Sequence, residues 1–203
     1  MIETISWTVV AFLSGSLPFA VWFGRLAGKN VRAVGDRNPG AINAFRAGGK
    51  WLGLAVLLLD VSKAAAPIGW AYYEWGWRGA QMIPVAIAPM LGHAYSPFLG
   101  FKGGKAIATA LGVWIGLTLW KVPVVAVSAL TIFYLTLRNS GWSLLLTLAT
   151  LGVYLSLFLP EPTFFIVLAL QTVLLLWKHR QDLHQPPWRK RVVSTPPENK
   201  AGN

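Results

Sequence analysis

Long apolar segments separated by short polar stretches occupy most of the sequence. A helix that crosses a lipid bilayer needs about 20 mostly apolar residues, with a range of about 17–25. Most of the segments fit this length, but residues 106–138 are too many for one crossing and are divided at Lys121 and Pro123. The pattern predicts an all-α membrane protein, a polytopic bundle of about seven transmembrane helices, over residues 5–26, 51–73, 81–99, 106–120, 122–137, 142–159 and 163–177.

The composition supports a membrane protein. Hydrophobic residues make up 55% of the chain and charged residues 12%, about half the charged fraction of a typical soluble domain. Cysteine is absent, which excludes a disulfide scaffold, a thiol nucleophile and a cysteine-ligated metal. We expect one integral membrane domain over residues 1–183. Residues 184–203 form a basic and polar tail that is too poor in apolar residues to fold alone.

Basic residues outnumber acidic residues by 18 to 7, which gives a formal net charge of +11. In a chain this apolar and aromatic, the charge indicates contact with anionic lipid rather than with nucleic acid. With seven spans, the first, third and fifth connections share a side with the C-terminus, and fifteen of the 18 Lys and Arg residues fall there. Because such residues concentrate on the cytoplasmic side, we expect the C-terminus in the cytoplasm and the N-terminus outside.

The first connection, residues 34–50, is rich in glycine, amide side chains and arginine. Gly35 and Gly40 permit tight turns. Asn43 and Arg46 are three positions apart and share a face if this part is helical. We interpret the segment as an anion or polyol site at the membrane surface. The alternative is a turn whose arginines only follow the positive-inside bias.

The third connection carries a glycine pair between two lysines, Lys102-Gly103-Gly104-Lys105. Backbone N–H groups and two ammonium groups can bind a phosphate there, and a helix that starts at about Ala106 adds a favourable partial charge. The segment is not a Walker motif, because the glycine spacing differs and no Ser or Thr follows Lys105. His93 lies upstream, and its alternative interpretation is a helix-end histidine with a satisfied hydrogen bond.

Two further groups of charged residues lie at the membrane. Asp60 and Lys63 fall inside the second predicted span, where ionisable groups are costly and face protein or water. At positions i and i+3 they can pair, either as a neutralised structural pair or as part of a functional site. Residues 178–182 follow the last span and include His179, and such clusters are commonly interfacial anchors.

Taken in order, these blocks resemble the PlsY-type acyl-phosphate:glycerol-3-phosphate acyltransferases of bacteria, from Phe12 to Leu183. Phe-Lys-Gly-Gly-Lys shortly after Gly-His is specific to this family among small membrane proteins. The residues that carry the resemblance are Gly15-Ser16, Gly35, Asn38-Pro39-Gly40-Ala41, Asn43, Arg46, Leu59-Asp60, Lys63, Gly92-His93, Phe101-Lys102-Gly103-Gly104-Lys105, Ala108-Thr109 and His179-Arg180.

The resemblance implies a multi-pass enzyme of the bacterial inner membrane, with its motif loops in the cytoplasm and no cofactor or metal. It implies transfer of an acyl chain from acyl phosphate to the 1-hydroxyl of glycerol 3-phosphate, giving lysophosphatidic acid. Direct attack on a mixed anhydride needs no enzyme nucleophile, so positioning and charge neutralisation would supply most of the catalysis. The implied catalytic residues are Lys105, His93 and Arg46. The implied substrate-binding residues are Asp36, Asn38, Asn43, Arg46, Lys102, Gly103, Gly104, Lys105, Arg138, Ser140 and His179.

The chain departs from the family pattern at several motif positions. Asp36-Arg37 replaces Ser-Gly, Ile42 stands where Thr is usual, Ala106 replaces a glycine, and Asp182 replaces an asparagine. We expect Asp36 to pair with Arg37 or Arg46, or to accept a hydrogen bond from the glycerol hydroxyls. The departures leave three hypotheses: an active glycerol-3-phosphate acyltransferase, a divergent relative with another acceptor or no catalysis, and a small transporter that uses Asp60 and Lys63.

Overall fold

The computed structural model describes residues 1–137 and 139–188, so Arg138 and most of the predicted tail lie outside the described residues. The described residues form helices and connections, with no strand among them. The elements are α1 (Ile2–Ser16), α2 (Phe19–Leu26), α3 (Ala41–Gly69), η1 (Trp70–Glu74), η2 (Gly79–Gln81), α4 (Met82–Ala94), η3 (Pro97–Leu99), α5 (Ile107–Thr118), α6 (Lys121–Leu137), α7 (Ser140–Phe158), α8 (Pro162–Lys178) and α9 (Arg180–Leu183).

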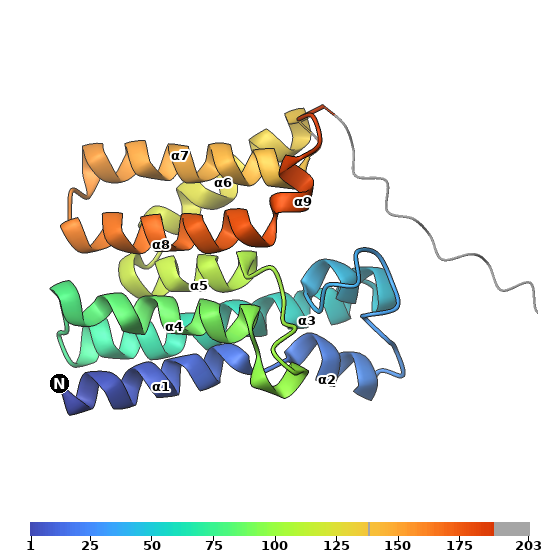
Figure 1. The fold of residues 1–203 in the computed structure, drawn as a ribbon, viewed down its shortest axis with the longest axis horizontal. Coiled ribbons are helices and arrows are strands. Elements are labelled where there is room, and N and C mark those ends of the chain that lie inside the picture. Colours follow the sequence, from blue (N-terminus) through green and yellow to red (C-terminus); the bar gives the residue numbers. More distant parts are fainter. Residues whose placement is uncertain (138, 189–203) are drawn as a thin grey trace, which may run out of the picture.

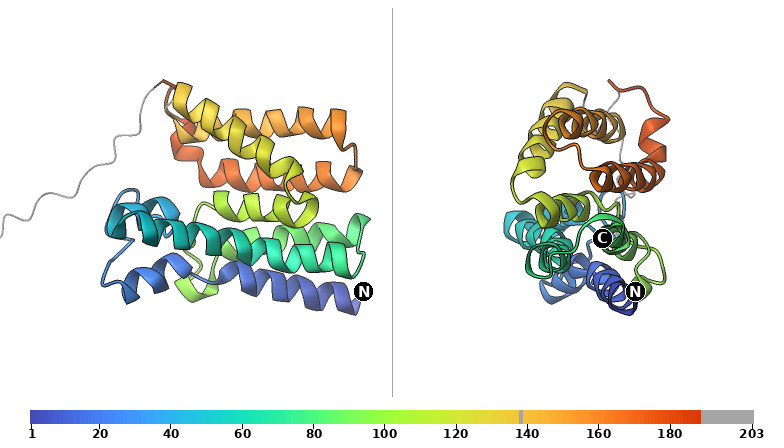
Figure 2. Two further views of the ribbon diagram at one scale, coloured as in Figure 1. Left: turned by 180° about the vertical axis from the view of Figure 1, so that it is seen from behind. Right: turned by 90° about the vertical axis from the view of Figure 1, so that its left-hand side faces the viewer.

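The predicted all-α membrane bundle is confirmed. Four helical segments are long and apolar enough to cross a membrane, and three shorter apolar helices accompany them. The predicted division near Lys121 is present, because α5 ends at Thr118 and α6 begins at Lys121. The long helices lie side by side (Figures 1 and 2), with α1 packed on α4, α3 on α5, and α6 on α7.

The second span differs from its prediction at the start. Its helix begins at Ala41 rather than at residue 51, and a kink at Gly49, where φ is 78°, separates a short polar part from the apolar part. The prediction followed apolar length, which does not detect a helical turn made of small and polar residues outside the lipid. This short part of α3 carries Asn43 and Arg46.

The first span is broken between α1 and α2. Pro18 has no backbone N–H and fixes φ, so the helix cannot run through it. The break leaves the Leu17 carbonyl outside the helical hydrogen-bond pattern, and this oxygen accepts a hydrogen bond from the Lys63 ammonium at 2.9 Å. The interruption seen in the sequence at residues 14–18 therefore supplies a polar contact for the buried side chain of Lys63.

Close packing of α1 on α4 depends on two glycines. A Cβ added at Gly15 would lie 2.1 Å from the Pro89 carbonyl oxygen, and one at Gly92 would lie 2.2 Å from the Phe12 carbonyl oxygen. Small residues commonly allow such close approach between membrane helices. Gly92 directly precedes His93, so this contact also fixes where the histidine lies relative to the break in the first span.

Four segments with the predicted motifs meet at one end of the bundle, opposite the N-terminus (Figure 1). They are the connection before α3, the connection from η3 to α5, the start of α7, and α9. Between the N-terminus and α9 lie four apolar helical segments long enough to span a membrane and three shorter apolar helices, and this odd number places α9 at the end opposite the N-terminus. The candidate site is therefore built from segments that are far apart in the sequence.

Candidate active site

Two polar clusters lie at this end of the bundle. The outer cluster consists of Asp36, Asn43, Lys105, Ser140 and Asp182, all from the connections and helix ends. The inner cluster consists of Asp60, Lys63 and His93, which are buried between α3 and α4. The Gly103-Gly104 segment lies between them, because Lys105 belongs to the outer cluster and Gly104 contacts His93.

Lys105 is the centre of the outer cluster. Its Nζ lies 3.0 Å from Asp36 Oδ2 and 3.1 Å from Asp182 Oδ2, while the lysine side chain retains 21% of its exposure. The ammonium thus links the first connection to α9. It is also partly accessible, which is what an ammonium that receives a phosphate from solution requires.

The first connection is held by amide hydrogen bonds. Asn43 Nδ2 donates to Asp36 Oδ1 at 2.9 Å and to the Asn38 carbonyl at 2.8 Å. Arg46 Nη1 lies 3.5 Å from Asn43 Oδ1, so the predicted shared face of Asn43 and Arg46 is confirmed. Gly35 allows this approach, since a Cβ there would lie 2.3 Å from both Arg46 Nη1 and Asn43 Oδ1.

Asp182 belongs to the outer cluster through contacts that the sequence did not reveal. Its carboxylate accepts a hydrogen bond from Ser140 Oγ at 3.0 Å as well as pairing with Lys105. The side chain of Asn139 caps α7 and donates to the Asp182 backbone carbonyl at 3.1 Å. Lys105 and Asp182 are 77 positions apart, and no local spacing in the sequence indicates a contact over that distance.

The pKa of the Asp36 carboxyl is set by opposing effects. Burial raises the pKa. The Lys105 ammonium and the hydrogen bonds from the Asn38 N–H and from Asn43 lower it by a larger amount, so the net pKa lies below the usual 3.8. A lowered pKa in the folded state contributes stability that is present above the unfolded value and lost as the pH falls through the folded value.

We therefore expect Asp36→Asn to reduce the acid sensitivity of the protein. In the natural protein the thermal unfolding temperature should fall as the pH drops below about 4, partly because Asp36 becomes protonated and releases Lys105. The Asp36→Asn variant should have a lower unfolding temperature than the natural protein at pH 7, and its unfolding temperature should fall less steeply as the pH drops. Parallel curves for the two proteins would show that the Asp36–Lys105 pair adds no stability.

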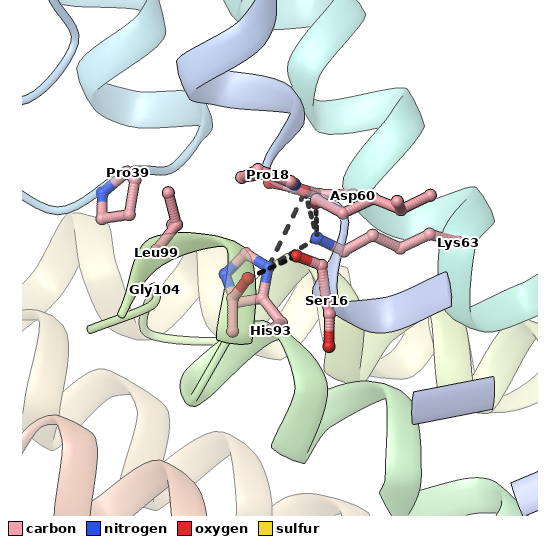
Figure 3. A pocket seen from close by; sticks show the side chains of 10 residues that line it. Ser16, Pro18, Pro39, Asp60, Lys63, His93, Leu99 and Gly104 are labelled. Carbon is pink, nitrogen blue, oxygen red and sulfur yellow. Dashed lines mark hydrogen bonds and ion pairs between the residues drawn. The ribbon is translucent and has the colours of Figure 1, made fainter. Parts of the chain in front are cut away.

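The inner cluster is a compact buried network (Figure 3). Lys63 Nζ lies 2.7 Å from Asp60 Oδ1, 2.8 Å from His93 Nδ1 and 2.9 Å from the Leu17 carbonyl oxygen. The side chains of Asp60 and Lys63 are each only 3% exposed. The predicted pairing at positions i and i+3 is confirmed, and the structure adds His93 as a third member.

The glycine pair is seated directly on His93. The Gly104 N–H donates to the His93 carbonyl at 2.9 Å. A Cβ at Gly103 would lie 2.0 Å from this carbonyl oxygen, and a Cβ at Gly104 would lie 2.1 Å from His93 Nε2. No other residue type fits at these two positions without displacing the histidine, so the histidine fixes the position of the segment that ends in Lys105.

Comparison with known proteins identifies the family. A family model described as glycerol-3-phosphate acyltransferase matches residues 5–186. The chain belongs to the glycerol-3-phosphate acyltransferase family. Among curated relatives, it is 39% identical over 181 residues to the glycerol-3-phosphate acyltransferase of Anaeromyxobacter sp. (strain Fw109-5), covering 86% of this chain and 88% of that one. It is 36% identical over 186 residues to that of Pasteurella multocida (strain Pm70), covering 91% and 90%.

Solved structures of the glycerol-3-phosphate acyltransferase family agree with this fold. The chain resembles the glycerol 3-phosphate form of PlsY (YgiH), an integral membrane glycerol 3-phosphate acyltransferase, with a TM-score of 0.82 and 28% identity over 90% of each chain. It resembles the lysophosphatidic acid form with a TM-score of 0.80 and 26% identity, again over 90% of each. The resemblance drawn from the motifs is thereby confirmed.

Two departures from the glycerol-3-phosphate acyltransferase pattern fall on strained backbone. Arg37 and Ala106, which stand where the family usually has glycine, both have a φ of 62°. This left-handed region is favoured by glycine and costs other residues about 1–2 kcal/mol. The backbone of both loops therefore keeps the conformation that glycine suits although the residues have changed. Ala106 immediately precedes α5, as the sequence predicted for the start of that helix.

Three further basic residues belong to the predicted motifs: Lys102 and Arg138 as predicted substrate-binding residues, and Lys178 as a member of the cluster after the last span. Lys102 is exposed, and its backbone carbonyl accepts a hydrogen bond from Arg32 at 3.0 Å. Lys178 lies at the end of α8 and donates to the Ala94 carbonyl at 2.9 Å. Arg138 is outside the described residues, so its predicted role is not placed here.

His179 is a buried histidine next to the outer cluster. Its pKa is lowered to about 4, first by burial and also by the Lys105 charge, while the hydrogen bond with the Leu175 carbonyl and the carboxylates of Asp182 and Asp36 oppose this effect. The ring is therefore neutral near pH 7. Nδ1 lies 2.8 Å from the Leu175 carbonyl oxygen, which can only accept, so the proton is on Nδ1 and Nε2 is an acceptor. Nε2 is buried and has no hydrogen-bond partner among the described residues.

Proposed function

We propose that this chain transfers an acyl chain from acyl phosphate to the 1-hydroxyl of glycerol 3-phosphate. The products are lysophosphatidic acid and inorganic phosphate. Support comes from membership of the glycerol-3-phosphate acyltransferase family and from the likeness to PlsY in its glycerol 3-phosphate and lysophosphatidic acid forms. The observation that carries the proposal is the convergence of the motif loops on Lys105 at one end of an apolar bundle.

The outer cluster suits a phosphorylated polyol. In this proposal Lys105 and Arg46 bind phosphate charge, and phosphate replaces one of the two carboxylates that hold Lys105. Asn38 and Asn43 lie beside Asp36, whose carboxylate accepts hydrogen bonds from the glycerol hydroxyls. Arg138 and Ser140 complete the substrate-binding set, with Lys102 nearer the lipid headgroups and the Gly103-Gly104 backbone against the phosphate.

The reaction needs little covalent chemistry from the enzyme. The glycerol hydroxyl oxygen attacks the acyl carbonyl carbon, a new C–O ester bond forms, and the C–O bond to phosphate breaks. The hydroxyl proton passes to the leaving phosphate, directly or by way of the acceptor nitrogen His179 Nε2. Lys105, Arg46 and His93 stabilise the charge that gathers on the phosphate as it leaves, which is usually the largest contribution to such catalysis.

A second acceptor class has one observation in its favour. Asp36 and Asp182 both pair with Lys105, and carboxylates disfavour a phosphate in the same place. An acceptor with less negative charge, such as a neutral polyol, would meet less repulsion. The two candidates separate in one comparison: transfer to glycerol 3-phosphate against transfer to glycerol, for the natural protein and for Asp36→Ser/Arg37→Gly.

We also propose that the motif end of the bundle faces the cytoplasm of a bacterium and that the N-terminus lies outside. The support is the excess of basic residues on the connections at that end. A reporter fused after Asn203 should then be active only if it is of the cytoplasm-dependent type. Activity of a periplasm-dependent reporter at the same position would contradict this orientation.

Complementation tests the proposed function in a cell. A bacterium that lacks its acyl-phosphate-dependent acyltransferase should grow when it expresses this chain, and should not grow when it expresses the Lys105→Ala variant at the same level in its membrane. Growth with neither protein, although both are present in the membrane, would count against acyl transfer to glycerol 3-phosphate.

A further inference from the structure

The inner cluster determines which nitrogen of His93 carries a proton. A lysine ammonium has three N–H donors and no acceptor. The contact of 2.8 Å between Lys63 Nζ and His93 Nδ1 is therefore a hydrogen bond only if Nδ1 accepts. A histidine whose Nδ1 accepts is neutral and carries its proton on Nε2. The other two donors of Lys63 are directed to Asp60 Oδ1 and to the Leu17 carbonyl.

The surroundings of Lys63 hold this arrangement in place. Asp60 fixes the ammonium from within α3, and Leu17 presents its carbonyl because Pro18 breaks the first span. The remaining hydroxyls nearby are already engaged: Ser16 donates to the Phe12 carbonyl at 2.7 Å, and Ser96 donates to the Ser16 carbonyl at 2.6 Å. Asp60 Oδ1 lies 3.7 Å from His93 Nδ1, which is too far for a hydrogen bond, so Lys63 at 2.8 Å is the hydrogen-bond partner of this nitrogen.

The proton on Nε2 faces the glycine pair. Nε2 lies 2.1 Å from the position that a Cβ of Gly104 would take, and the ring hydrogen bond of His93 to a described residue is made by Nδ1. A cavity of about 10 Å³ adjoins the ring and is lined in part by Ser16, Pro39, Leu99 and Gly104 (Figure 3). That volume is about the minimum that one water-sized group needs.

We propose that Lys63 holds neutral His93 in the tautomer with the proton on Nε2, and that this N–H donates to an oxygen of a phosphate group bound at Gly103-Gly104. This proposal rests on the proposed function for the phosphate but not for the tautomer. His93 then contacts substrate, whereas Lys63 and Asp60 are positioning residues that act through it. A donor fixed before substrate binds needs no reorganisation during the reaction.

The tautomer is tested first, without reference to activity. The full-length protein in lipid nanodiscs is labelled with 15N-histidine, and the three histidines are assigned by comparing His93→Gln and His184→Gln with the natural protein. We expect an unprotonated Nδ1 and a protonated Nε2 at His93 near pH 7. In Asp60→Leu/Lys63→Met, which removes both charges together, the two tautomers should mix. A proton on Nδ1 in the natural protein would overturn the proposal.

Two substitutions of His93 then distinguish a hydrogen-bond donor role of its side chain from a role in filling space. Glutamine places an amide N–H₂ near Nε2, whereas asparagine reaches only to Nδ1 and keeps an acceptor for Lys63. We expect His93→Asn to lose about 10- to 100-fold in kcat/KM, the usual effect of removing one hydrogen bond to a charged group, and His93→Gln to recover most of it. Equal losses in both variants, with unchanged unfolding temperatures, would overturn the donor role.

The KM for acyl phosphate and the KM for glycerol 3-phosphate show which substrate carries the phosphate that contacts His93. If the oxygen belongs to the acyl phosphate, His93→Asn raises KM for acyl phosphate, or lowers kcat, and leaves KM for glycerol 3-phosphate unchanged. If it belongs to the acceptor, the KM for glycerol 3-phosphate rises instead. His184→Gln, an exposed histidine outside both clusters, serves as the control and should behave as the natural protein. No change in any constant for His93→Asn would overturn the contact with phosphate.

Discussion

Replacing Lys105 by alanine should lower kcat/KM for acyl transfer by about 10²- to 10³-fold, the usual effect of removing one donor that stabilises developing charge. Lys105 is the partly exposed ammonium on which the first connection and α9 converge. Without it, the leaving phosphate and the two carboxylates of Asp36 and Asp182 share a region that has lost its central positive charge. The rate should be measured with purified protein at saturating and at limiting acyl phosphate.

The neighbouring Lys102 provides the matched control. Its side chain is exposed, and its backbone carbonyl accepts a hydrogen bond from Arg32. Lys102→Ala removes the same charge from the same loop and should therefore cost far less than Lys105→Ala. Lys102→Ala should keep the natural unfolding temperature to within a few degrees, as substitutions of exposed side chains commonly do. Lys105→Ala should lower it, because the carboxylates of Asp36 and Asp182 lose their ammonium partner, so the rates are compared at a temperature where both variants are folded. Unchanged turnover in the Lys105→Ala variant would show that Lys105 does not stabilise the phosphate.

The second large effect is on stability. Lys63→Met should destabilise the protein by about 3–5 kcal/mol, because it leaves the carboxylate of Asp60 buried without its ammonium partner. Both side chains are 3% exposed, so solvent does not screen the loss. Equilibrium unfolding of the purified protein in mixed micelles of a mild and a denaturing detergent measures the difference in the free energy of unfolding.

The double variant Asp60→Leu/Lys63→Met is the control for this prediction. It removes both charges and should return the free energy of unfolding to the natural value or above it, since well-packed apolar residues often replace a buried ion pair without loss. A double variant as unstable as Lys63→Met would mean that the contacts of Lys63 with Leu17 and His93, rather than its pairing with Asp60, account for the stability.

Local features of the fold and the site were predictable from the sequence. Apolar length predicts the spans, and Lys121 with Pro123 divides residues 106–138 into two helices. Spacing of three along a helix predicts the Asp60–Lys63 pair and the shared face of Asn43 and Arg46. These features depend on residues within one or two helical turns, which is the range over which spacing determines proximity.

Contacts between distant segments were not predictable in this way. The pairing of Lys105 with Asp182 joins the third connection to α9, and the hydrogen bond of Lys63 with His93 joins α3 to α4. Each depends on how helices pack, and that packing depends on close approaches such as Gly92 on Phe12. The start of α3 at Ala41 was also missed, because its first turns lie outside the lipid and lack an apolar signal.

Acyl transfer by the purified protein tests the central claim most directly. The protein, in detergent and again in lipid nanodiscs, is given acyl phosphate and radiolabelled glycerol 3-phosphate, and labelled lysophosphatidic acid and free phosphate are both measured. We expect the two products in equal amounts and a rate that falls by about 10²- to 10³-fold in Lys105→Ala. A natural protein that forms no labelled lysophosphatidic acid in either environment, while remaining folded, would contradict the proposed function.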